Sequence, residues 1–117
     1  MGAGGTNVDD PAIAAYREAH LNITGKVADY WASANTYAAL QILEQAIVGA
    51  ATLDRNVVTQ YIKDNSFDTV MGTLAFENQV SNTFWSVGQW QDGVFRGVKG
   101  SNVEGAVPVR TKSGWSE

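Results

Sequence analysis

The chain contains no cysteine, two prolines and a single histidine among its 117 residues. The absence of cysteine excludes disulfide bonds, thiolate metal sites and cysteine nucleophiles. The one histidine, His20, has no histidine or carboxylate at metal-ligand spacing around it. We therefore expect His20 to have a surface or capping role near the end of a helix, with no metal site and no cofactor.

Positive charge is also scarce, with 8 Lys and Arg residues against 12 Asp and Glu residues, a net charge of -4 and a pI near 4.8. This balance argues against nucleic acid or an anionic membrane as a partner. The 44% hydrophobic content predicts one folded domain with a moderate core. The first residues lack the basic and then apolar pattern of a signal peptide, so none is expected in this sequence.

One stretch, residues 29–51, is apolar over most of a helical circumference. It reads DYWASANTYAALQILEQAIVGAA, and Glu44 is its only charged residue after Asp29. Alanine, leucine, glutamine and glutamate favour helix, and side chains such as Leu40 and Ile47 recur at helical spacing. The stretch is too polar and too rich in alanine for a membrane span. We predict the buried helix of an α/β or α+β layer.

Two shorter helices are predicted on either side of it. Asp10 and Pro11 provide a cap and a proline at the first helical position, and that helix is expected to end near Asn22. After the central stretch, Asp54 is expected to cap a third helix, which Asn65 would stop in a left-handed conformation.

The pattern then changes to that of strands. Residues 69–76 are rich in β-forming side chains and predict one strand, with a possible bulge at Gly72. Residues 84–91 predict a second strand, and the pair Asp92-Gly93 predicts a tight hairpin turn into a third strand at residues 94–98.

The two ends of the chain carry weaker signals. Residues 1–8 are expected to form a flexible leader, and the tail, residues 99–117, either adds an edge strand or runs over the surface. Trp85 and Trp90 fall on opposite faces of a regular strand, so we expect them to pack and not to form a stacking platform.

The sequence offers no catalytic constellation. No nucleophile is paired with a base, and Asp68, Glu77 and Asp92 each fit a turn or a cap. We therefore predict that the chain is not an enzyme.

Three stretches carry a resemblance to a known family. They are TYAALQ at residues 36–41, YIKDNSFDTVMGTL at residues 61–74 and VGQWQDG at residues 87–93. They resemble, in this order and spacing, the C-terminal third of the periplasmic substrate-binding proteins of ABC transporters for branched-chain amino acids, the leucine/isoleucine/valine type. The family often has proline where Thr73 stands here.

The resemblance implies the α/β fold of type I periplasmic binding proteins, in which two lobes joined by three crossover strands hold the ligand between them. This chain would be a partial α+β piece: three helices, a crossover strand and a β-hairpin. Residues 9–68 would be the helical part of the first lobe, and residues 69–98 the crossover strand and terminal hairpin. The resemblance also implies a periplasmic parent that captures amino acids or related amides and delivers them to a membrane permease.

The resemblance places one ligand contact in this chain. An aromatic residue that lines the ligand's side-chain pocket in the family aligns with Ala32, next to Tyr30 and Trp31. Tyr30, Trp31 and Ala32 are therefore the candidate ligand-binding residues, although Tyr30 and Trp31 could equally pack the start of the helix. The groups that bind the α-carboxylate and the α-ammonium of the ligand would come from segments outside this chain.

A rival interpretation is a self-associating structural remnant without a ligand of its own. In a monomer that lacks the first-lobe strands, Tyr37, Leu40, Leu43 and Ile47 are expected to face water. Because exposed apolar patches of this kind usually become interfaces, we predict a homo-oligomer, possibly with the strand at residues 69–76 exchanged between copies. Alternatively, the tail folds back over the helices and gives a monomer.

Overall fold

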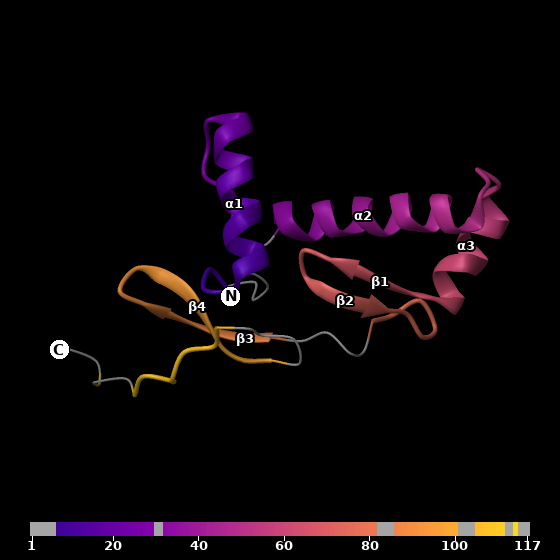
Figure 1. Ribbon diagram of the computed structural model, residues 1–117. Helices are drawn as coiled ribbons and strands as arrows, with labels where there is room; N and C mark the ends of the chain where they lie inside the picture. The colour runs from indigo at the N-terminus through magenta and orange to yellow at the C-terminus, as the bar shows by residue number, and fades with distance from the viewer. Residues whose placement is uncertain (1–6, 30–31, 82–85, 101–104, 112–113, 115–117) are drawn as a thin grey trace.

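The computed structural model describes residues 7–29, 32–81, 86–100, 105–111 and 114. Within these ranges the chain forms three helices and two small antiparallel sheets, a mixed α+β arrangement (Figure 1). The α+β class predicted from the sequence is confirmed. In chain order the elements are α1 (Pro11–Thr24), α2 (Ala32–Ala50), α3 (Arg55–Asp64), β1 (Ser66–Thr69), β2 (Gly72–Ala75), β3 (Ser86–Gln91) and β4 (Val94–Gly100).

Helix α1 begins as its sequence predicts. The Asp10 side chain accepts hydrogen bonds from the backbone N–H groups of Ala12 (2.8 Å) and Ile13 (3.3 Å), and Pro11 occupies the first turn. The helix continues to Thr24, two residues beyond the expected end. It stops where Gly25 takes a positive φ of 69° and donates its N–H to the carbonyl of Leu21, a conformation that glycine adopts without strain.

Helix α2 confirms the long central helix, and Asp29 caps it through the N–H groups of Ala32 (2.6 Å) and Ser33 (3.2 Å). Its buried face consists mainly of small residues, which lets neighbouring elements approach closely. These residues are Ala34, Ala38, Ile42 and Ala46. Near the end of α2, a methyl group on Gly49 would come within 2.3 Å of the Tyr61 hydroxyl on α3. Gly49 therefore makes the close packing of α3 possible.

Helix α3 also begins at its predicted cap, because Asp54 accepts hydrogen bonds from the N–H groups of Asn56 and Val57. The prediction for its end is wrong. Asn65 has extended backbone angles, φ -128° and ψ 166°, and not a left-handed conformation. Its side-chain Nδ2 instead donates to the carbonyl of Tyr61 at 2.8 Å, so a side chain satisfies the end of the helix.

The single strand predicted at residues 69–76 is wrong. The chain forms a hairpin here, in which β1 pairs with β2 from Ser66 opposite Ala75 to Thr69 opposite Gly72. The turn is Val70-Met71, followed by Gly72 at a φ of 94°. Residues 72–75 of the expected crossover strand thus pair with β1 of the same chain, in a sheet of two strands.

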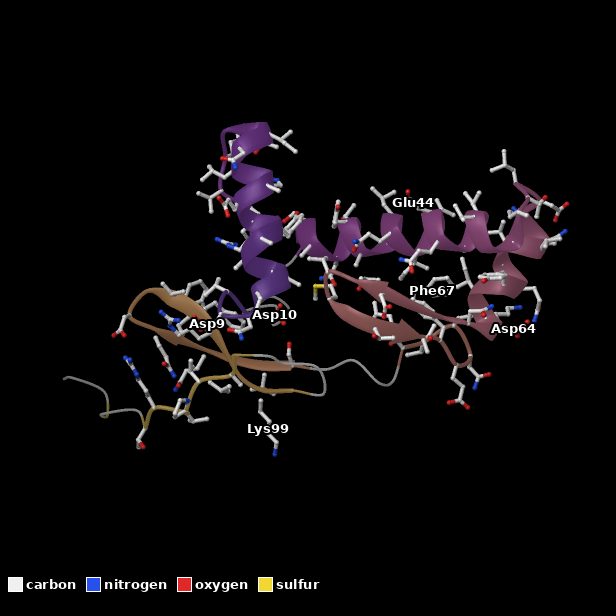
Figure 2. All side chains as sticks on the ribbon, in the orientation of Figure 1. Asp9, Asp10, Glu44, Asp64, Phe67 and Lys99 are labelled. Carbon is white, nitrogen blue, oxygen red and sulfur yellow. The ribbon has the colours of Figure 1, made fainter. Side chains whose placement is uncertain are left out.

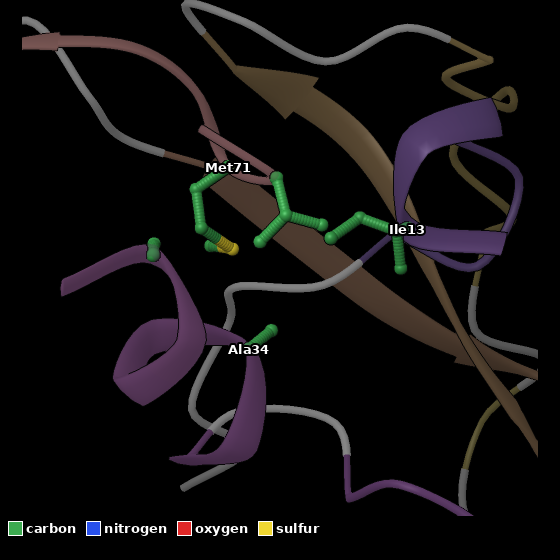
Figure 3. Packing of buried hydrophobic residues seen from close by; sticks show 5 residues of the cluster. Ile13, Ala34 and Met71 are labelled. Carbon is green, nitrogen blue, oxygen red and sulfur yellow. The ribbon is translucent and has the colours of Figure 1, made fainter. Parts of the chain in front are cut away.

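Two apolar clusters form the core. The first joins α1, α2 and the β1–β2 turn, where Ile13, Ala34 and Met71 meet (Figure 3). The second lies farther along α2, where Phe67 projects from β1 toward α2 and α3 and is 2% exposed (Figure 2). The α1–α2 helices and the β1–β2 hairpin therefore share one elongated core.

Strands β3 and β4 form the predicted terminal hairpin, with Asp92 and Gly93 both at positive φ (54° and 77°) in its turn. The described part of the tail, residues 105–111 and 114, forms no strand. It lies along this hairpin, since Gln91 donates to the carbonyl of Pro108 at 3.0 Å and Gln89 to that of Arg110 at 2.8 Å. These tail residues therefore contact the hairpin, to which Val107 adds a hydrogen bond from its N–H to the carbonyl of Gly97 at 2.9 Å.

Of the expected flexible leader, residues 1–6 lie outside the described residues, and the structure describes only its last two residues, Asn7 and Val8. Asn7 is 6% exposed, and its side-chain oxygen accepts the N–H of Gly97 on β4 at 2.8 Å. Asp9 forms an ion pair with Arg96 on the same strand. These bonds attach the start of α1 to the hairpin near the other end of the chain (Figure 1).

The molecule is elongated. Its radius of gyration is 16.6 Å, whereas a compact domain of this length has about 13 Å. In Figure 1, helix α2 runs across the view, the β1–β2 hairpin lies beneath it, and α1 stands across its N-terminal end and rises above it. One long side of α2 is thus covered by its own chain.

Candidate functional site

A groove of about 980 Å³ lies in the angle between α1 and α2. Small apolar residues of α1 form one wall, and the N-terminal half of α2 forms the other. The β1–β2 turn closes one edge of the groove. Its lining residues are Ala12, Ala15, Tyr16, Ala19, His20, Ile23, Thr24, Asp29, Ala32, Ser33, Thr36, Tyr37, Leu40, Gln41, Asp68, Thr69 and Val70.

Three aromatic side chains, Tyr16, His20 and Tyr37, pack together where α1 meets α2 at the groove. The ring of Tyr16 on α1 lies 5.2 Å from that of Tyr37 on α2, and 5.9 Å from the imidazole of His20 (centroid distances). Tilted rings at such distances attract each other beyond the effect of their burial. These ring contacts therefore help to set the angle at which α1 crosses α2, together with the packing of Ile13 against Ala34.

The polar side chains along the groove are largely engaged by the fold. His20 Nδ1 lies 3.0 Å from the carbonyl of Lys26, in the loop that follows α1. Thr36 donates to the carbonyl of Ala32, and the carboxylate of Asp29 caps α2. The hydroxyl of Ser33 is buried without a hydrogen-bond partner. Apart from this hydroxyl, the groove offers mainly the apolar side chains of its lining, so it suits an apolar group better than a charged one.

Two glutamines of α2, of which Gln41 lines the groove, bind the backbone of the β1–β2 hairpin. Gln41 Oε1 accepts the N–H of Val70 at 2.8 Å, and Gln45 Nε2 donates to the carbonyl of Asp68 at 2.9 Å. These bonds satisfy backbone groups of a turn whose side chains are buried. They also fix the edge of the groove relative to α2.

Among the predicted ligand-binding residues, Ala32 is the first residue of α2, is exposed and lines the groove. Tyr30 and Trp31 lie outside the described residues. Sequence reasoning did not identify Tyr16, Tyr37 and Leu40 as groove residues. The aromatic residues on two predicted helices were the available signal, but the helix crossing was needed to bring them together.

Within the described ranges, no group of three or more His, Cys, Asp or Glu side chains is placed to hold a metal ion. The same ranges contain no helix long and apolar enough to span a membrane. No protein-family model, curated protein or solved structure matches this chain.

Proposed function

We propose that this chain is the C-terminal segment of an extracytoplasmic solute-binding protein of the type I periplasmic binding fold, which captures an amino acid or a related small amide for an ABC importer. The three stretches that resemble the family support this function. The observation that carries it is the position of Ala32, which the resemblance assigns to the ligand's side-chain pocket and which lines the α1–α2 groove.

The chemistry of the groove fits the side chain of such a ligand and not its charged end. Alanine side chains, Leu40 and the tyrosine rings offer apolar contact, whereas Asp29, the groove's carboxylate nearest to Ala32, caps α2. A desolvated α-amino acid needs partners for both of its charges. The proposed role is therefore one wall of a cleft, non-catalytic, with the α-carboxylate and α-ammonium held by other segments of the parent protein.

The chain alone should bind branched-chain amino acids only weakly. We would titrate leucine, and glycine as a control, into the isotope-labelled chain at a concentration where light scattering shows a monomer. Millimolar leucine should shift the backbone amide signals of Ala32, Thr36 and Leu40, whereas glycine should not. A micromolar site would contradict the proposed division of the ligand contacts. No response to leucine at tens of millimolar would refute the role of the groove.

Substitution of Ala32 gives a second test of the same wall. Ala32→Phe should place a ring in the groove and change the order of the shifts caused by leucine, isoleucine and valine, with little change in melting temperature. The matched control is Ala39→Phe, because Ala39 is exposed on α2 but does not line the groove. An unchanged ligand order together with a steep fall in melting temperature would show that Ala32 is a packing residue only.

The self-associating interpretation has an observation of its own. Tyr37, Leu40 and Leu43 are 46%, 59% and 45% exposed, in agreement with the expectation for a monomer, whereas Ile47 is partly buried against the second core cluster. The transport role also requires this face of α2 to be exposed in the isolated chain, because the strands of the first lobe would cover it in the parent protein.

A further inference from the structure

Two glutamines of β3 bind the main chain of the tail. Gln91 Nε2 donates to the carbonyl of Pro108 at 3.0 Å. Gln89 Nε2 donates to the carbonyl of Arg110 at 2.8 Å, and Gln89 Oε1 accepts the N–H of the same residue at 2.9 Å. The glutamines are two positions apart on β3, and their partners are two positions apart on the tail in the opposite direction. The tail therefore follows β3 in the antiparallel sense, with the spacing of an extended chain.

A glutamine side chain can take the place of a strand here because its amide has the same donor and acceptor as a peptide group. The two bonds between Gln89 and Arg110 reproduce the exchange between opposite residues of antiparallel strands. Gln91 Nε2 also donates to Gln89 Oε1 at 2.8 Å, which fixes the orientation of the Gln89 amide. Gln91 itself is 5% exposed. The side of β3 that faces the tail is therefore a fixed row of amide groups.

The side chains of the tail contribute less to this contact than its backbone. Of the described residues 105–111, Val107 alone is partly buried, and the others are exposed. The N–H of Val107 donates to the carbonyl of Gly97 on β4 at 2.9 Å. The ion pair between Arg110 and Asp92 joins side chains that are 58% and 72% exposed, and such pairs add little. The hairpin therefore recognises an extended backbone more than a particular sequence.

We infer that this side of the β3–β4 hairpin is a binding surface for an extended peptide, and that the chain's own tail is its occupant in the structure. The residues that take the places of Val107 and Arg110 must have an N–H, which excludes proline there. At the place of Pro108 the carbonyl is bound, which proline retains. Asp92 favours a basic residue at the place of Arg110. The surface thus fits an extended segment of another protein with proline two residues before arginine or lysine.

The attachment of the tail is weak enough to give way to such a partner. Main-chain hydrogen bonds that exchange with water each add little to stability, and the tail buries little apolar surface with them. The attachment also depends on Gly105, which has a φ of 69°. A methyl group on Gly105 would lie 2.4 Å from the carbonyl oxygen of Asp9. A substitution of Gly105 therefore weakens the competing tail and leaves Gln89 and Gln91 in place.

A peptide titration into the full chain tests this surface. The probe is the capped peptide GAVPVRT, the sequence of residues 105–111. At millimolar concentration it should displace the tail of the isotope-labelled chain. The N–H groups of Val107 and Arg110 should then exchange with water as in an unstructured segment. The side-chain amide signals of Gln89 and Gln91 should keep their positions, because the peptide replaces the same partners.

Two variants of the chain sharpen the titration. Gly105→Ala should bind the peptide about ten-fold more tightly, because the surface is then less often occupied by the tail. The matched control is Gly114→Ala, a tail glycine that also has a positive φ but has no atom within 4 Å of an added methyl group. It should bind the peptide as the wild type does. Equal affinities of Gly105→Ala and the wild type would contradict competition between tail and peptide.

Two altered peptides separate backbone from side-chain recognition. N-methylation of the arginine removes the N–H that Gln89 accepts and keeps every side chain, and it should weaken binding at least about ten-fold. Replacement of the arginine by alanine should weaken binding by at most about five-fold, since it removes an exposed ion pair.

The inference would be overturned if the N-methylated peptide bound as well as the parent peptide. It would also be overturned if Gly105→Ala showed no response to the parent peptide at tens of millimolar, or if the tail amides of the wild type exchanged freely before any peptide was added. The shifts that leucine causes in the α1–α2 groove are a separate measurement, so this test stands apart from the proposed transport function.

Discussion

The helical part of the molecule and its terminal hairpin are stabilised by different means. Among the described residues, the two apolar clusters include side chains from α1 to Phe76, and neither contains a residue of β3, β4 or the described part of the tail. The hairpin is instead connected through polar side chains: Asn7 and Asp9 at the start of the chain, and Gln89 and Gln91 toward the tail. Apolar burial gives the larger and less directional stabilisation, whereas hydrogen bonds fix position.

This difference suggests two levels of stability in one chain. The elements around α2 should unfold together, because each packs against the same helix. The β3–β4 hairpin should open at a lower free energy, since two-stranded hairpins are marginal without packing. Three substitutions test this comparison, from the largest expected effect to the smallest.

The largest effect is expected from the removal of a buried ring in the helical part. Phe67 is 2% exposed in the second cluster, and Phe67→Ala should lower the free energy of unfolding by about 3–5 kcal/mol. The control is Phe95→Ala in the hairpin, where Phe95 is 5% exposed and lies against Gly88 and Trp90. Denaturant unfolding followed by far-UV circular dichroism should show a smaller loss for Phe95→Ala. Equal losses would mean that the two parts unfold as one unit.

The sequence predicted the parts of this fold that depend on neighbouring residues. The Asp10 and Asp54 caps, the long helix and the Asp92-Gly93 turn each depend on a few consecutive residues whose conformational preferences are strong. The β1–β2 hairpin was missed because valine and methionine are unusual turn residues. Val70 and Met71 form a turn here because their side chains are buried against α1 and α2, which stabilises the turn. Gln41 also accepts a hydrogen bond from the backbone of the turn.

The candidate site was predictable to a similar extent. Ala32 could be named from a short resemblance, and it lines the groove. The opposite wall could not be named, because it depends on the angle between α1 and α2, which the contact between Tyr16 and Tyr37 helps to set. The attachment of Asn7 to Gly97 joins residues that are 90 positions apart, and no local pattern indicates such a bond.

A medium effect is expected when this attachment is removed. Asn7→Ala would leave the N–H of Gly97 without its acceptor in a buried position, at a cost of about 1–3 kcal/mol. The cost should appear as faster amide hydrogen exchange in β4, with little change in α2 and α3. Asn22→Ala, at an exposed position on α1, is the control and should leave exchange in β4 unchanged. Faster exchange throughout α2 would show that the hairpin supports the helical core.

The smallest effect is expected from an ion pair on the surface of the hairpin. Arg110 Nη1 lies 2.7 Å from Asp92 Oδ2, but these side chains are 58% and 72% exposed. Exposed pairs of this kind contribute about 0–1 kcal/mol and are screened by salt. The two bonds between Gln89 and residue 110 use the main chain of Arg110, so Arg110→Ala retains them.

Arg110→Ala should therefore lower stability by less than about 1 kcal/mol, and the loss should vanish in concentrated salt. Thermal melts at low and high ionic strength would measure both. Gln89→Leu is the informative comparison, because it removes both bonds to the main chain of Arg110 and should loosen this end of the tail at any salt concentration, while Val107 and Pro108 keep their bonds to Gly97 and Gln91. If Arg110→Ala costs more than Gln89→Leu and the loss persists in salt, the arginine side chain packs on the hairpin through its apolar stem, and apolar contact holds the tail as it holds the helices.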